Sequence, residues 1–187
     1  DQMIGEGNEA GNAAVQAVID GLDSFKADDL VGVRIFTSGI DGGSADFVDL
    51  APVQAIGPNR ERIKNQVDQL SPLNGTPLYT VTQRSYDQML TGYDPALINA
   101  VILLTDGRND DGNAADDRDQ LQSLLADVKN SNDGENSRPV RIFTIAYGGD
   151  TNPAELKRIS EASNATAYTA TDATTINDVF AAVVSNF

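Results

Sequence analysis

Two oxygen-bearing residues stand where an α/β protein commonly holds a metal ion. Asp106 directly follows the apolar run 100–105, and Thr76 directly precedes Pro77, where a helix is expected to begin. Ligands of open α/β sheets gather at the carboxyl ends of the strands, and hard divalent cations prefer oxygen ligands. Each residue also has an ordinary alternative, since Asp-Gly pairs form turns and Thr caps helices.

The loop 108–117 and the residues just after it hold a second concentration of carboxylates. Its acidic residues are Asp110, Asp111, Asp116, Asp117 and Asp119. Such a cluster could bind Ca²⁺, but it lacks the spacing of an EF-hand loop and the closing Glu of that motif. A solvated acidic loop is therefore the favoured interpretation.

The chain contains no His and no Cys, which removes several kinds of site. Disulfides, zinc sites of the usual kind and catalytic triads built on His or Cys are excluded. The glycines at positions 5, 7 and 11 are spaced much like a dinucleotide-binding loop, but no strand precedes them in this sequence. No P-loop and no G-x-S-x-G turn is present.

The formal net charge is −15, with 13 Lys and Arg against 28 Asp and Glu. This balance argues against nucleic acid and anionic membranes as partners, and it favours cations or basic proteins. The same charge also keeps a protein soluble, so it does not name a partner by itself. No apolar run approaches the ~20 residues that span a bilayer.

Hydrophobic periodicity predicts helices alternating with strands. Helices are expected over 8–26, 59–70, 77–90, 121–128, 152–163 and 176–187, and strands over 30–39, 45–57, 99–107, 140–148 and 165–170. Asn59 and Asn152 are expected to cap their helices, and Pro52 demotes its strand to a sheet edge.

This alternation predicts a single α/β domain over residues 1–187. Its sheet is expected to be mostly parallel, with 45–57 as an antiparallel edge and helices on both faces. The strands at 30–39, 99–105 and 140–147 are expected to be buried, with 99–105 in a central position.

The order of the motifs resembles the von Willebrand factor A (vWA) family over essentially the whole chain. GTPLY at 75–79, LLTDG at 103–107 and IAYG at 145–148 appear in the family's order, and VGVRIFTSG at 31–39 matches its second strand. The resemblance implies a Rossmann-like three-layer fold. It also implies a metal-ion-dependent adhesion site for Mg²⁺ (or Mn²⁺ or Ca²⁺), with Thr76 and Asp106 as metal ligands.

The family's first metal motif, Asp-x-Ser-x-Ser followed by Met, is where the sequence departs. Met3 aligns with that Met, so Asp1 and Gln2 are all that remains of the motif, and the leading Asp-x-Ser and its strand are missing or lie upstream. We therefore expect weak or no binding of Mg²⁺ by this chain alone. We also expect another segment to fill the slot between the strands at 30–39 and 99–105, because open sheet edges are costly.

The resemblance implies a non-enzymatic adhesion module that binds a protein partner whose carboxylate completes the metal's coordination. It also implies upstream domains or an anchor and an extracellular or cell-surface location. Two alternatives remain open: an intracellular subunit that partners a AAA+ ATPase, and a Mg²⁺-dependent phosphotransferase or hydrolase that uses Asp106.

Overall fold

The computed structural model describes residues 3–70, 75–133, 137–170 and 173–184. The chain divides into two compact units. The first unit comprises Asp1–Asn74 and Ala170–Phe187, and the second comprises Gly75–Thr169. That the two units form the single predicted domain stays a prediction.

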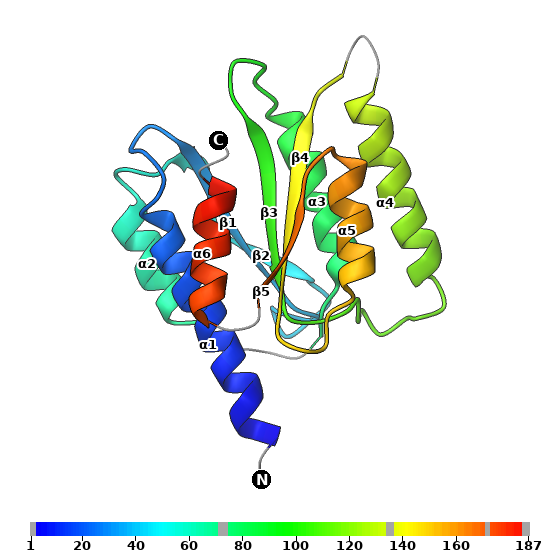
Figure 1. The fold of residues 1–187 in the computed structure, drawn as a ribbon, viewed down its shortest axis with the longest axis horizontal. Helices are drawn as coiled ribbons and strands as arrows, with labels where there is room; N and C mark the ends of the chain where they lie inside the picture. Colours follow the sequence, from blue (N-terminus) through cyan, green and yellow to red (C-terminus); the bar gives the residue numbers. More distant parts are fainter. Residues whose placement is uncertain (1–2, 71–74, 134–136, 171–172, 185–187) are drawn as a thin grey trace. The chain divides into compact units, whose positions relative to one another are not determined.

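The described helices and strands follow the predicted order (Figure 1). They alternate along the chain except that two strands are consecutive within 30–55 and two helices within 60–91. The elements are α1 (Met3–Leu22), β1 (Leu30–Phe36), β2 (Phe47–Ala55), α2 (Arg60–Asp68), α3 (Leu78–Thr91), β3 (Asn99–Thr105), α4 (Asp117–Asn132), β4 (Val140–Tyr147), α5 (Pro153–Ala162), β5 (Ala167–Ala170) and α6 (Ala173–Val184). The α/β fold class is confirmed. No described helix is long and apolar enough to cross a membrane.

The first unit is built on an antiparallel ribbon of β1 and β2, which confirms the antiparallel pairing of the segment 45–57. Its core lies between this ribbon and the helices α1 and α2. The buried members are Leu22, Ala51, Ile56, Ile63 and Val67. Helix α6 packs on α1, where the Phe180 ring occupies the space beside Gly21.

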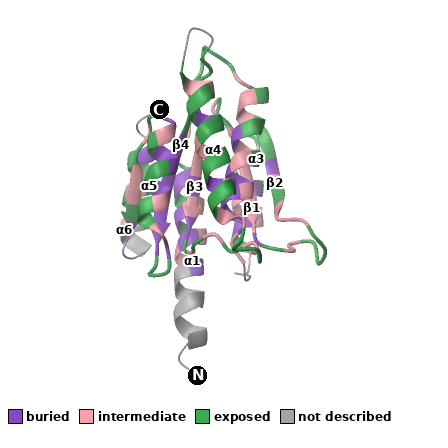
Figure 2. Cartoon of the chain, turned by 90° about the vertical axis from the view of Figure 1, so that its right-hand side faces the viewer, coloured by how far each residue is buried: buried purple, intermediate pink, exposed green. Residues whose placement is uncertain are grey.

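The second unit is built on a three-stranded sheet in the order β3-β4-β5. β3 and β4 pair in parallel from Asn99↔Val140 to Thr105↔Ala146 without a register shift. Every residue of β4 except Arg141 is buried (Figure 2). Helices α3 and α5 pack against these strands, and α4 packs between α3 and α5.

Burial of the three predicted core strands differs from the expectation. β4 is buried as predicted, whereas β3 mixes buried with half-buried residues. β1 has no fully buried residue, and its Leu30 is 54% exposed, so the prediction of a buried strand was wrong there. The reason is that only one face of the ribbon packs on the helices, while the other carries the Arg34–Asp49 ion pair.

Several boundaries and one cap also differ. α1 spans 3–22 rather than 8–26, and β1 ends at Phe36 because the chain turns through Gly39 at a φ of 65°. Asn59 does not cap α2 with its side chain and instead donates a hydrogen bond to the Ala55 carbonyl at 3.0 Å. The Asn152 cap of α5 is confirmed, since its side chain accepts from the Glu155 N–H.

β3 lies at an edge of its sheet rather than in the predicted central position, as far as the described residues show. Its sheet and the β1–β2 ribbon are separate in the described part of the chain. The expectation that a further segment pairs with β1 and β3 stays a prediction.

Candidate functional site at the ends of β3 and β4

The second unit brings Thr76 and Asp106, the two predicted metal ligands, to one place. Thr76 exchanges two backbone hydrogen bonds with Asp110, each 2.8 Å long. A Cβ atom added to Gly107 would lie only 2.9 Å from the Thr76 hydroxyl oxygen. The Thr76 hydroxyl therefore lies against the turn that directly follows Asp106, and a side chain at position 107 would collide with it.

The Asp106 side chain stands at the carboxyl end of β3, beside the end of β4. Asp106 is exposed, whereas the preceding Thr105 is buried, so the strand end delivers the carboxylate to solvent. A Cβ on Gly148 would lie 3.8 Å from the Asp106 Cβ. Burial raises the pKa of Tyr147, and the negative charge of Asp106 raises it further, so the Tyr147 hydroxyl stays neutral beside the carboxylate.

The ordinary alternative for Thr76 does not hold. The N-cap residue of α3 is Pro77, and it supplies no side-chain cap. The acceptor at the start of the helix comes instead from another segment, since the backbone N–H of Tyr79 donates to Asn109 Oδ1 at 3.1 Å. Asn109 was not among the predicted site residues. The one feature of the sequence that could have identified Asn109 is its place as a polar residue three positions after the strand-end Asp106.

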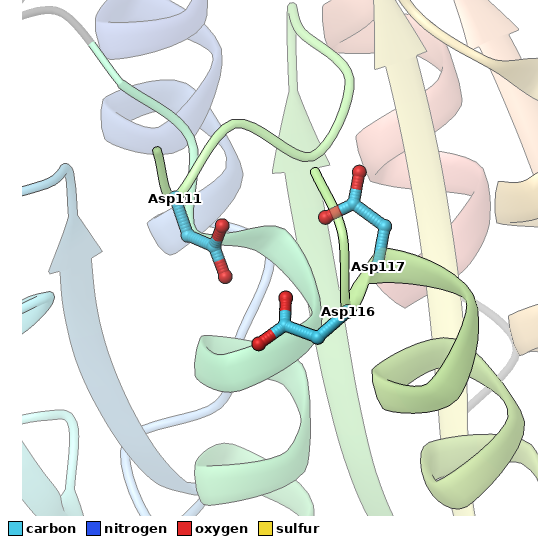
Figure 3. A group of neighbouring side chains, drawn as sticks. All are labelled: Asp111, Asp116 and Asp117. Carbon is cyan, nitrogen blue, oxygen red and sulfur yellow. The ribbon is translucent and has the colours of Figure 1, made fainter. Parts of the chain in front are cut away.

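Three of the five predicted loop acids gather into a cluster: Asp111, Asp116 and Asp117 (Figure 3). One carboxylate oxygen from each residue lies within 4.8 Å of the corresponding oxygens of the other two. Side-chain amides already serve all three: Gln120 donates to Asp111 and Asp116 at 2.9 and 3.0 Å, and Asn109 donates to Asp117 at 2.7 Å. Hydrogen bonds therefore offset part of the charge repulsion among these half-buried carboxylates. That the loop is simply a solvated acidic loop stays a prediction.

The donors at Thr76 and Asp106 suit a hard divalent cation in their chemistry. One is a carboxylate, the other is a hydroxyl, and Gly107, which has no Cβ, lets the Thr76 hydroxyl approach the turn after Asp106. Two side chains are fewer than a near-octahedral ion such as Mg²⁺ requires, so water or another segment must provide the remaining ligands. Asp1 and Gln2, the remnant of the first motif, lie outside the described residues.

Several solved structures have a fold similar to that of this chain. A von Willebrand factor type A protein from Catenulispora acidiphila superposes with a TM-score of 0.70 at 22% identity, over 92% of this chain and 37% of that protein. Proximal thread matrix protein 1 from the mussel byssus, with a zinc-occupied MIDAS motif, gives 0.66 at 20% identity, over 94% of this chain and 42% of that protein.

The pilus adhesin SpaC from Lactobacillus rhamnosus GG, in its open conformation, gives a TM-score of 0.70 at 13% identity. The match covers 94% of this chain and 28% of the adhesin, so this chain spans less than half the length of each of these three proteins. No curated protein sequence matches the chain significantly.

The model of the von Willebrand factor type A domain matches residues 12–182, which include Thr76, Asp106 and all the strands. This match and the superpositions confirm the resemblance seen in the sequence and the Rossmann-like α/β fold class. The chain belongs to the von Willebrand factor type A domain family.

Proposed function

We propose that this chain is a non-enzymatic protein-binding module that recognises its partner through a divalent metal ion held by Thr76 and Asp106. The observation that carries the proposal is the contact of the Thr76 hydroxyl with the turn after Asp106. Two segments that are 30 residues apart in sequence thereby offer a hydroxyl and a carboxylate at one strand end.

Bound at this place, a divalent cation would supply a Lewis-acidic position for an oxygen ligand of the partner. Asp106 would provide the protein's negative charge, and Thr76 would provide a neutral oxygen. The partner is a protein that offers a carboxylate, and the net charge of −15 favours basic residues around that carboxylate.

The location that fits this role is extracellular or on a cell surface. Two of the similar structures are described as a pilus adhesin and a matrix protein of the mussel byssus. The zinc in the MIDAS motif of the byssus protein supports a metal-dependent role for this fold, with Mg²⁺, Mn²⁺ or Ca²⁺ as the expected ions here.

The test is a calorimetric titration with Mn²⁺ of this chain and of an extended version, in which an added strand that ends in Asp-x-Ser-x-Ser replaces Asp1 and Gln2 directly before Met3. We expect weak or undetectable binding by the first and clear binding by the second, because the extension adds a carboxylate and two hydroxyls. Asp106→Asn and Thr76→Val should each remove the binding that the extension creates, since each deletes one oxygen ligand at constant side-chain shape.

Asp119→Asn is the matched control, because Asp119 is an exposed acid in the first turn of α4, outside the three-residue cluster. It removes the same charge as Asp106→Asn and should leave most of the affinity. Equal losses of Mn²⁺ affinity in Asp106→Asn and Asp119→Asn would mean that the ion is attracted only by the protein's overall negative charge. No binding by the extended protein would leave Asp106 as a turn residue and would refute the metal site.

A further inference from the structure

We propose that Asn109 is a positioning residue that holds the segment of Thr76 and the segment of Asp106 at a fixed spacing. The role in metal binding rests on the function proposed above. The holding of the two segments rests only on hydrogen bonds within the second unit.

The first contact of Asn109 is with the start of α3. The N–H groups of a first helical turn have no partner inside the helix. In α3 the N-cap Pro77 offers no side-chain acceptor, and Asn109 Oδ1 accepts from the N–H of Tyr79 at 3.1 Å. A residue 30 positions further along the chain therefore performs the capping that local sequence does not.

The second contact of Asn109 is with the start of α4. Its Nδ2 donates to Asp117 Oδ1 at 2.7 Å, which is the length of a charge-assisted hydrogen bond. One partner of Asn109 is therefore a donor and the other is an anion. Only an amide side chain presents an acceptor and a donor at the same branch point, so the chemistry of both partners fixes its orientation.

The neighbouring backbone reinforces this bridge. Asp110 exchanges its two 2.8 Å hydrogen bonds with Thr76, next to the contact of Asn109 with Tyr79. Three hydrogen bonds therefore join residues 109–110 to residues 76–79. The Tyr79 hydroxyl donates to Glu155 at 2.8 Å, so α3 is also tied to α5. The spacing of Thr76 from Asp106 follows from these attachments.

Removing the bridge should leave both metal ligands in the protein but loosen their spacing. Residues that orient metal ligands typically change metal affinity by about 10–100-fold. Asn109→Asp is the sharpest disruption, because it replaces the amide donor with a carboxylate that repels the carboxylate of Asp117. An oxygen acceptor for the Tyr79 N–H is still present, so the variant changes only the contact with Asp117. We expect it to speed the hydrogen exchange of the Tyr79 and Asp110 amides and to weaken Mn²⁺ binding by about 10-fold or more.

The decisive variant is the reciprocal exchange Asn109→Asp with Asp117→Asn, which leaves the net charge unchanged. The new carboxylate at position 109 can accept from the Tyr79 N–H and from the new amide at position 117. We expect this double variant to return the amide exchange of Tyr79 and Asp110 to within about 3-fold of the parent protein, because both hydrogen bonds are kept and the residual effect is no larger than that of one hydrogen bond.

Asn113→Asp is the matched control. Asn113 lies in the same exposed loop and donates to Asp116 at 2.8 Å, so the variant adds the same charge against an acid of the same cluster. It has no hydrogen bond to α3 in the described contacts, and we expect the exchange of Tyr79 to stay unchanged.

Amide exchange, measured by NMR without metal, decides the proposal. A double variant as disrupted as Asn109→Asp, or equal effects of Asn109→Asp and Asn113→Asp, would overturn it. Mn²⁺ affinity, measured in the extended protein, decides the function proposed above. Absence of binding in the extended parent protein would refute the metal site, while the exchange data would still support or overturn the holding role of Asn109.

Discussion

The two units pair their strands in different ways. β3 and β4 run parallel over seven pairs in unbroken register, and β4 is buried at seven of its eight positions. β1 and β2 run antiparallel with register shifts on both sides of Val33, and β1 keeps two exposed residues. One unit therefore has a regular sheet, and the other has an irregular ribbon.

This difference explains why the second unit offers a strand-end position for Asp106. Strands that run parallel in register end at the same level, so Asp106 after β3 lies beside Tyr147, the last residue of β4, and Gly148, which follows it. In an antiparallel pair, the strand that leaves the sheet at one end meets the start of its partner. The candidate site therefore lies at the end of the parallel sheet. The β1–β2 ribbon instead carries the Arg34–Asp49 ion pair on the face that does not pack on the helices.

The largest expected effect tests the difference in burial. Ile145 of β4 is fully buried, so Ile145→Ala should lower the free energy of unfolding by about 2–5 kcal/mol through lost burial and a cavity. Val48 of β2 is 40% exposed, and Val48→Ala should change it by about 0.5 kcal/mol or less. Urea denaturation of both variants provides the measurement. Similar losses in the two would show that the ribbon is as tightly packed as the sheet.

An intermediate effect tests the helix packing of the first unit. A Cβ on Gly21 would overlap the Phe180 ring, so Gly21→Ala should force α1 and α6 apart. We expect a loss of about 1–3 kcal/mol from overpacking, reduced by the ~1 kcal/mol that Ala gains over Gly in a helix. Thermal unfolding followed by circular dichroism provides the measurement.

Gly92→Ala in the second unit is the matched control for this prediction. Gly92 follows α3 with a φ of −93°, and a Cβ there would find its nearest neighbour at 3.7 Å. We expect no loss of stability, because the conformation and the space both accept Ala. A Gly21→Ala protein as stable as Gly92→Ala would mean that Phe180 moves aside at no cost.

The smallest effect concerns the loop between β1 and β2. Hydrogen bonds from the backbone N–H groups of Gly43 and Ala45 lower the pKa of Asp41 below its ordinary value of 3.8. Because the native pKa is the lower one, the stabilisation is fully present above pH 3.8 and is lost as the pH falls through the native value. Asp41→Asn should flatten this part of the stability profile, measured by urea denaturation at several pH values. An unchanged profile would contradict the prediction.

The second unit follows its local sequence closely at several elements. The apolar runs that become β3 and β4, and the Asn152, Pro153 and Glu155 signal at the start of α5, appear in the structure as predicted. Continuous apolar runs can be buried on both faces only in a layered sheet, and caps depend on neighbours within one turn. Such features are legible in sequence because their causes are local.

The sequence by itself determined the α/β class, the presence of buried parallel strands and the identity of Thr76 and Asp106 as candidate ligands. Only the tertiary structure decided that β1 would be half exposed, that Asn59 would bond to Ala55 rather than cap α2, and that Asn109 would cap α3. The hydrogen bonds of Asn59 and Asn109 depend on acceptors and donors outside their own segments. The exposure of β1 depends on which face of the strand the helices cover. Periodicity and capping signals report the residue's own segment, whereas a hydrogen bond across 30 residues follows from packing that no local pattern records.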